Sequence, residues 1–433
     1  MRFLRWSLTT GLVGLVVSCG PKPPARTALQ GDLLALKRDI ASAQREKKLD
    51  RDAVVSLARA LGERELMSAH GTDGALRVRA LRPCAQPLRG TIERRANSGD
   101  DVAAELTLIL LEMHAADRAS LLKRYAESSS GAWRAVAARA AVRPAETDLR
   151  QRFFADPDER VRRAALSAAH DAHHASELAA LLETARLDPD PQSQSLAARA
   201  AGAIGGERAV LALRDLWAQA EDELRIAIVD GWVEPASFVS GGERELAAAA
   251  ESSTGLASVS ASFALARSHG AESAPANARL RRYMQDGSDD EKRLALSIAL
   301  LDAENEAALR DAAKKASPEL RAVALARLSR VPAARNEAII ALRTLANAKP
   351  ASAADERARD TALSALAEAG DSSVHAALVK DLTDKDRQTR GRAARGLTEL
   401  GDYSNAATVL GDDDANLRTD LACTILARED RGH

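Results

Sequence analysis

One pattern recurs along most of the chain: a polar or acidic turn, an apolar residue followed by arginine, and then small and apolar residues at helical spacing. The clearest copy is DPDERVRRAAL at 156–166. Other copies lie at the pairs Leu224-Arg225, Leu320-Arg321, Ala358-Arg359, Thr389-Arg390 and Leu417-Arg418, and weaker ones at Trp133-Arg134, Leu196-Ala197, Val259-Ser260 and Lys292-Arg293. Their mean spacing is near 32 residues. Units of this period bury their apolar faces by stacking on their neighbours, so we expect a repeat array.

Each copy carries the signals of a helix pair. An Asp or Ser before the apolar-Arg pair is placed to cap a helix, and Pro157 and Pro318 stand near a helix start. Gly205, Gly370 and Gly401 suit the left-handed position that ends a helix. A second helix follows, for example over 208–217 or 373–382. Alanine contributes 93 of the 433 residues and aromatic residues only 3%, which favours helices over sheets.

This pattern resembles the HEAT repeat, and especially the shorter HEAT-like repeats first noted in phycobilin lyases. The resemblance is good over 132–433 and weaker over 32–131, where 50–61 and 100–114 still have helical periodicity. It implies an all-α solenoid, a superhelix of about ten to twelve helix pairs, with the Asp-x-x-Val-Arg helix lining the concave face. We expect an elongated molecule, with a radius of gyration above the about 22 Å of a compact chain. Tetratricopeptide repeats need more aromatic positions than this chain has.

The N-terminus carries an export signal. Arg2 and Arg5 precede a stretch of 12 uncharged, mostly apolar residues, Trp6 to Val17, which is too short to span a bilayer comfortably. The sequence Val-Val-Ser-Cys at 16–19 follows and resembles the lipobox of bacterial lipoproteins. That resemblance implies diacylglycerol on the Cys19 sulfur, cleavage before Cys19 and acylation of its new amine. An ordinary secretory signal with an incidental cysteine is the alternative.

We therefore divide the chain into a signal peptide (1–18), a lipidated cysteine with a Pro-rich, partly extended tether (19–31), weaker helical repeats (32–131) and the main HEAT-like array (132–433). Beyond residue 31 no apolar run is long enough for a membrane helix, so the acyl chains would be the membrane attachment. The expected location is the bacterial cell envelope. Gly20, in place of an inner-membrane retention Asp, favours the outer membrane facing the periplasm, although the leaflet stays open.

Charge and cysteine content restrict the partners and the covalent framework. The formal net charge is −1, so the chain lacks a general field for nucleic acid or an anionic membrane surface. Besides Cys19, only Cys84 and Cys423 occur, 339 positions apart near opposite ends of the array. Because a disulfide needs Cα atoms within about 7 Å, we expect two buried thiols that behave as small apolar side chains.

No motif predicts a catalytic site, a cofactor or a metal. His170, His173 and His174 form a histidine cluster that could meet on one helical turn and bind zinc, but no Cys or Glu completes a known zinc signature, so a solvated turn is favoured. The glycines at 202–206 lack the Lys-Ser/Thr of a phosphate-binding loop and fit a helix cap.

The recurring arginines have two interpretations. They could form a ligand-binding stripe, but a ladder of Asp–Arg pairs between neighbouring repeats is favoured because it satisfies helix ends. Trp133, Trp217 and Trp232 could likewise anchor a partner or fill gaps between Ala-rich helices.

The favoured function is a membrane-tethered scaffold that binds an unknown protein or peptide along a concave face of mixed charge. Two alternatives remain: an enzyme subunit or lyase-like protein, supported by fold analogy alone, and a passive envelope component without a dedicated partner.

Overall fold

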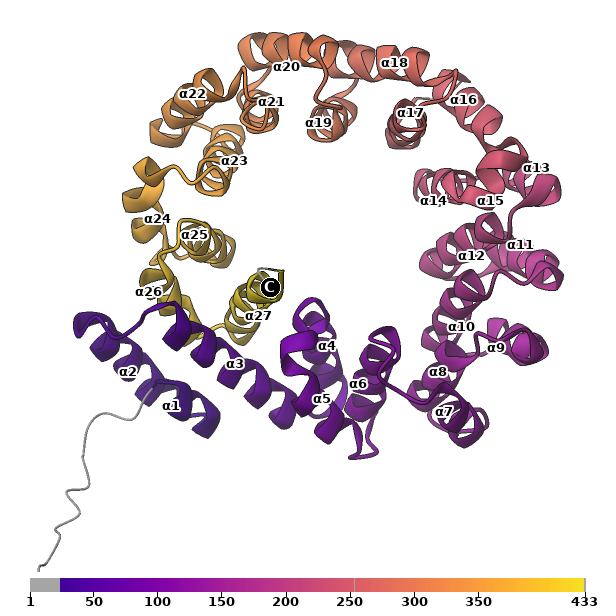
Figure 1. The fold of residues 1–433 in the computed structure, drawn as a ribbon, viewed down its shortest axis with the longest axis horizontal. Helices are drawn as coiled ribbons and strands as arrows, with labels where there is room; N and C mark the ends of the chain where they lie inside the picture. Colours follow the sequence, from indigo (N-terminus) through magenta and orange to yellow (C-terminus); the bar gives the residue numbers. More distant parts are fainter. Residues whose placement is uncertain (1–23, 253, 432–433) are drawn as a thin grey trace, which may run out of the picture.

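The computed structural model describes residues 24–252 and 254–431, which form a two-layered ring of helices (Figure 1). No strand occurs among these residues, as the repeat pattern predicts. None of their helices is long and apolar enough to cross a membrane. The predicted signal peptide and Cys19 lie outside the described residues.

The inner layer consists of one helix from each repeat (Figure 1). Its members are α4 (Gly71–Ala80), α6 (Asp101–Glu112), α8 (Gly131–Ala140), α10 (Glu159–Ala172), α12 (Pro191–Ile204), α14 (Asp222–Val233), α17 (Leu256–Arg267), α19 (Asp289–Ile298), α21 (Pro318–Leu328), α23 (Ala353–Glu368), α25 (Arg387–Glu399) and α27 (Ala415–Arg431). The helices that carry the apolar-Arg pairs belong to this layer, so their predicted position on the inner side is confirmed.

The outer layer contains α3, which precedes the first inner helix, and then the helix that follows each inner helix from α4 to α25 (Figure 1). Its members are α3 (Arg51–Ser68), α5 (Arg89–Ala96), α7 (Arg118–Tyr125), α9 (Thr147–Phe154), α11 (Leu178–Leu187), α13 (Gly206–Trp217), α16 (Glu243–Ser252), α18 (Ser273–Asp286), α20 (Ala303–Lys315), α22 (Arg335–Asn347), α24 (His375–Asp381) and α26 (Tyr403–Ala406). Buried Ala, Leu, Ile and Val side chains between the two layers form a core that continues around the ring.

The helix ends follow the sequence signals. Asp158 and Asp386, which precede apolar-Arg pairs, accept hydrogen bonds from backbone N–H groups at the starts of α10 and α25, as predicted. Pro318 is the first residue of α21, whereas Pro157 lies one residue before the N-cap Asp158. Gly205, a predicted helix end, has a positive φ and joins α12 to α13.

Part of the tether predicted at 19–31 forms a helix. Residues Pro24–Gln30 form helix α1, followed by α2 (Leu33–Arg45), and α1 packs against α3 with Thr27 and Ala28 buried. Proline is tolerated in the first turn of a helix, and the apolar face of α3 offers α1 a packing surface. This part of the tether is therefore helical rather than extended.

The two ends of the array meet, which was not expected from the sequence. Helix α27 packs along α3, and it also contacts α4 and the short helix η1 (Arg82–Cys84) (Figure 1). Cys84 and Cys423 form a disulfide with a Cα–Cα distance of 5.2 Å. The expectation of two separate buried thiols was wrong because it treated the solenoid as open, whereas its curvature returns the last repeat to the first.

Candidate functional site

The recurring arginines are structural. Arg162 donates two hydrogen bonds to Asp188 in the next inner turn (2.7 and 3.0 Å) and one to the carbonyl of Asp156 in its own turn. The hydrogen bond to Asp188 is the main reason why the pKa of Arg162 lies above its ordinary value. The equivalent pairs are Arg134–Asp156, Arg359–Asp381 and Arg390–Asp412. The predicted Asp–Arg ladder is therefore present at these repeats.

A second ladder runs through the outer turns, and sequence analysis missed it. Arg150 and Glu177 form a fully buried ion pair (2.7 Å), and Arg150 also donates to the carbonyl groups of Ala141 and Arg143. Equivalent links join Asn277 to Asp302, Arg343 to Asp371 and His375 to Asp402. The partners lie 25 to 28 residues apart. A search for polar residues at that separation could have found them.

Ion pairs between neighbouring inner helices neutralise much of the remaining charge on this layer. Examples are Arg139–Asp171, Arg199–Asp230, Arg293–Glu319 and Arg428–Glu399, at N–O distances between 2.6 and 2.9 Å. The inner layer thus carries both signs of charge.

Beside α17, an apolar groove interrupts the series of ion pairs between neighbouring inner helices. The groove has a volume of about 720 Å³ and is lined by α14, the segment that follows it, α17 and α19. From α17 it receives Ser260, Phe263, Ala264 and Arg267. Ser260 stands where most copies of the repeat have arginine, so the weak copy Val259-Ser260 was the sequence signal for this site.

The last residue of α14 and the segment after it supply exposed apolar side chains to the groove. Val233 is 43% exposed and Val239 is 83% exposed, and both line the groove with Phe238. Val239 lies in a kinked turn, η5 (Phe238–Gly242), in which Ser240 and Gly241 leave helical geometry and Gly241 has a φ of 111°. The kink holds Val239 outside the core, where it can contact a partner.

Two ionisable groups lie in the groove lining. The guanidinium of Arg267 is placed over the Phe263 ring, 5.4 Å from its centre. Asp230 forms an ion pair with Arg199 at 2.8 Å, and burial raises the pKa of Asp230. Asp230 is therefore engaged by the protein itself, whereas Arg267 makes no ion pair among the residues described in the structure.

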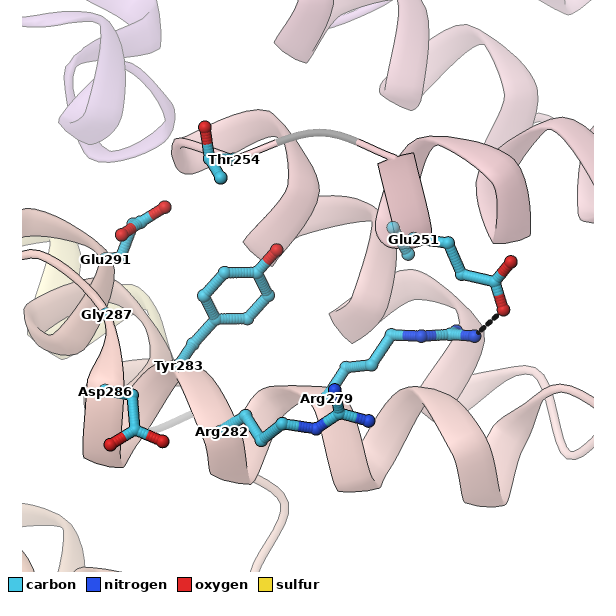
Figure 2. A pocket seen from close by; sticks show the side chains of 9 residues that line it. Glu251, Thr254, Arg279, Arg282, Tyr283, Asp286, Gly287 and Glu291 are labelled. Carbon is cyan, nitrogen blue, oxygen red and sulfur yellow. Dashed lines mark hydrogen bonds and ion pairs between the residues drawn. The ribbon is translucent and has the colours of Figure 1, made fainter.

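A second cavity, of about 490 Å³, lies where α16, α18 and α19 meet (Figure 2). Arg279 forms an ion pair with Glu251 across it. Glu291 accepts hydrogen bonds from the backbone N–H groups of Gly255 (2.6 Å) and Ser288 (2.7 Å), which lower its pKa. The carboxylate of Glu291 thus holds the starts of α17 and α19 together.

The histidine cluster serves the turn after α10. His173 ends that helix in a left-handed conformation (φ 50°), and His174 Nδ1 contacts Ser176 Oγ at 2.9 Å. His170 Nε2 lies 3.2 Å from Glu234. Among the described residues, no group of three or more His, Cys, Asp or Glu side chains could hold a metal ion.

Trp133, Trp217 and Trp232 pack between helices. Trp133 stacks on Tyr125 and donates to the carbonyl of Gly99, and Trp232 donates to that of Val210. Trp217 is partly buried against Trp232. They fill gaps between helices, which was the second of the two interpretations.

Comparison with known proteins finds a similarity for part of the array. Residues 146–231 match the family model of HEAT repeats, so this part of the chain is similar to HEAT repeats. A crystal structure of a Kap121p mutant matches with a TM-score of 0.32 and 12% identity, covering 92% of this chain and 47% of that one. The chain thus spans about half the length of that solved protein. A search of curated proteins found no match.

Proposed function

We propose that this protein is a membrane-tethered scaffold of the bacterial cell envelope that holds a segment of a partner protein in the groove of α14, α17 and α19. HEAT-repeat solenoids generally bind protein partners through extended surfaces. The observation that supports this site is the apolar groove itself, which lies between inner helices that are joined to their other neighbours by ion pairs.

The groove favours an amphipathic helix as its occupant. A volume of about 720 Å³ accommodates several apolar side chains, and the groove crosses three successive repeats. Helices bind such grooves with apolar residues spaced three or four positions apart. Arg267, at the edge of the groove, would pair with a carboxylate on that helix, because Asp230 already pairs with Arg199. The occupant is therefore an apolar helix with an acidic residue on its flank.

The tether is proposed from the sequence. The short apolar stretch and the Val-Val-Ser-Cys motif at 16–19 would place acyl chains on Cys19. With Gly20 after the cysteine, the outer membrane facing the periplasm is the favoured location. Replacement Cys19→Ala should abolish acylation and release the chain from membranes, which mass spectrometry of the mature N-terminus and fractionation would measure. An unacylated wild-type N-terminus would contradict the tether.

The groove can be tested by photocrosslinking in intact cells. A photoreactive residue placed at Phe263 or Val239 should give one discrete adduct, and matched probes at exposed Leu187 or Ile340 on outer helices should not. Mass spectrometry of the adduct should identify an apolar helical segment with a neighbouring acidic residue. Equal adducts from all four positions, or an adduct to lipid or a polar loop, would contradict the proposal.

Charge reversal tests the acidic part of the occupant. Arg267→Glu should reduce the Phe263 adduct by about tenfold, because the variant places a negative charge opposite the acidic residue of the occupant. Lys349→Glu is the matched control, because Lys349 is an exposed cation in the loop after α22 and outside the groove. Equal adduct yields in the two variants would show that the occupant carries no acidic residue at Arg267.

A further inference from the structure

The ring is closed by contacts between residues that are hundreds of positions apart. Helix α27 lies beside α3, and the short helix η7 (Ala407–Gly411) lies beside α2 (Figure 1). Cys84, at the end of η1, is bonded to Cys423 in the middle of α27. Both side chains are buried, with exposed fractions of 1% and 5%. We call this region, where the first and last repeats meet, the seam.

The ion pairs at the seam lie at its surface, and a partly buried hydrogen bond crosses it, from Gln44 Nε2 to the carbonyl of Ser404 (2.7 Å). Arg51 forms a two-point ion pair with Glu429 (2.6 and 2.9 Å), and Lys37 contacts Asp413 at 2.6 Å. The Arg51 and Asp413 side chains are exposed, and exposed pairs contribute little to stability. Apolar packing of α27 on α3 and the disulfide therefore supply most of what holds the seam.

The seam also takes the place of end caps. In an open solenoid, each terminal repeat has one side without a neighbour and needs a polar capping surface there. Here α27 contributes buried Leu421 and Ile425, and the N-terminal end contributes buried Leu81 and Leu88. Helix α27 contacts both η1 and η2 (Gln86–Leu88), so separation of the ends would uncover apolar surface on each.

We propose that the Cys84–Cys423 disulfide is a redox-controlled clasp that keeps the ring closed. Formation of the bond removes two protons and two electrons from the thiols, and a disulfide-containing oxidant takes up both and becomes a dithiol. A dithiol reductant reverses the step by attacking one sulfur through a mixed disulfide. Because both sulfurs are buried, α27 must first move away locally before a reductant can reach them.

The clasp requires an oxidising compartment, since disulfides persist there and are reduced in the cytosol. Export by the proposed signal would supply such a compartment. The clasp does not depend on the groove or on its occupant, so the two proposals fail separately.

Thiol labelling tests whether the bond forms. The full chain is expressed with its export signal and denatured in a polymer-linked maleimide without reductant. We expect no label at Cys84 or Cys423, and labelling of both after reduction. Cys19 is distinguished by peptide mapping. Labelling of both residues before reduction, or a disulfide-linked species of twice the mass, would overturn the intramolecular clasp.

Hydrogen exchange tests whether the bond controls closure. The oxidised full chain is compared with the same protein reduced by a phosphine under native conditions. Reduction should speed amide exchange in α3 and α27 by about tenfold or more and leave α10 and α12 unchanged. The double variant Cys84→Ser/Cys423→Ser should match the reduced protein without any reductant. Unchanged exchange in α3 and α27 after complete reduction would show that the bond is passive.

Discussion

Arg162 on α10 reaches Asp188 across the interface between two repeats, and the acceptor atom Asp188 Oδ1 also accepts the backbone N–H of Asp190. Asp190 in turn caps the first turn of α12. One aspartate therefore connects the arginine of one helix to the start of the next. Because Asp156-x-Asp158 and Asp412-x-Asp414 are built in the same way, the turn has the same internal geometry at distant points of the ring.

Loss of this arginine should weaken the local repeat. Arg162→Ala leaves the buried carboxylate of Asp188 without its partner and should cost about 3 kcal/mol in unfolding free energy. Arg160→Ala removes an exposed pair with Asp158 and should cost less than about 1 kcal/mol. Urea unfolding monitored by circular dichroism would measure both. Equal losses would show that burial of the pair is unimportant.

Two helical glycines should respond oppositely to alanine. A Cβ at Gly202 would lie 2.3 Å from the Gly231 Cα on α14, so Gly202→Ala forces two packed helices apart and should cost about 1–3 kcal/mol. Gly90 on α5 has open space, its nearest neighbour being the end of Arg94 at 3.9 Å. Gly90→Ala should stabilise the protein by up to about 1 kcal/mol because alanine favours the helix. Thermal unfolding of the two variants would decide this.

The contact between His170 on α10 and Glu234, the residue after α14, should make the stability of the protein depend on pH. Hydrogen bonds to Asp171 and then to Glu234 raise the pKa of His170 above its ordinary value of 6.5. The stabilisation is therefore fully present below pH 6.5 and is lost as the pH rises through the folded-state pKa. His170→Gln should flatten this part of the stability profile. NMR titration should show a lower His170 pKa in Glu234→Gln, and an unchanged pKa would exclude Glu234 as a contributor.

The disulfide should contribute substantially to stability. It closes a loop of 339 residues, for which the loop-length relation extrapolates to roughly 6 kcal/mol, and measured values are often smaller. The variant Cys84→Ser/Cys423→Ser should therefore melt several degrees below the oxidised wild type, and the reduced wild type should melt with the variant. Calorimetry without reductant measures the difference. Coincident melting of oxidised and reduced protein would contradict this prediction.

Local features of the fold were predictable because their causes are local. The caps Asp158 and Asp386 act within one helical turn, and the ladder from Arg162 repeats with the period of the sequence. The groove was only hinted at by Ser260, because its walls come from three repeats and from the kink at Gly241. A pattern within one repeat does not describe how three repeats combine.

Ring closure could not be predicted from the repeat pattern. Small rotations between successive repeats set the curvature of a solenoid, and they depend on packing details such as the close approach of Gly202 to Gly231. The same pattern is compatible with an open superhelix, in which Cys84 and Cys423 would lie far apart. The packing of α1 against α3 could not be predicted either, because α1 lies in a Pro-rich stretch with little periodicity.

The meeting of α27 with α3 limits how this protein can change over evolution. An open array tolerates the duplication or loss of a whole unit, since only the number of stacked neighbours changes. In a closed circle, the angular steps of all units must add up to one full turn. A single added or deleted unit would separate Cys84 from Cys423 or bring their helices into collision. The number of units is therefore under geometric selection, and variation in length should be confined to the turns.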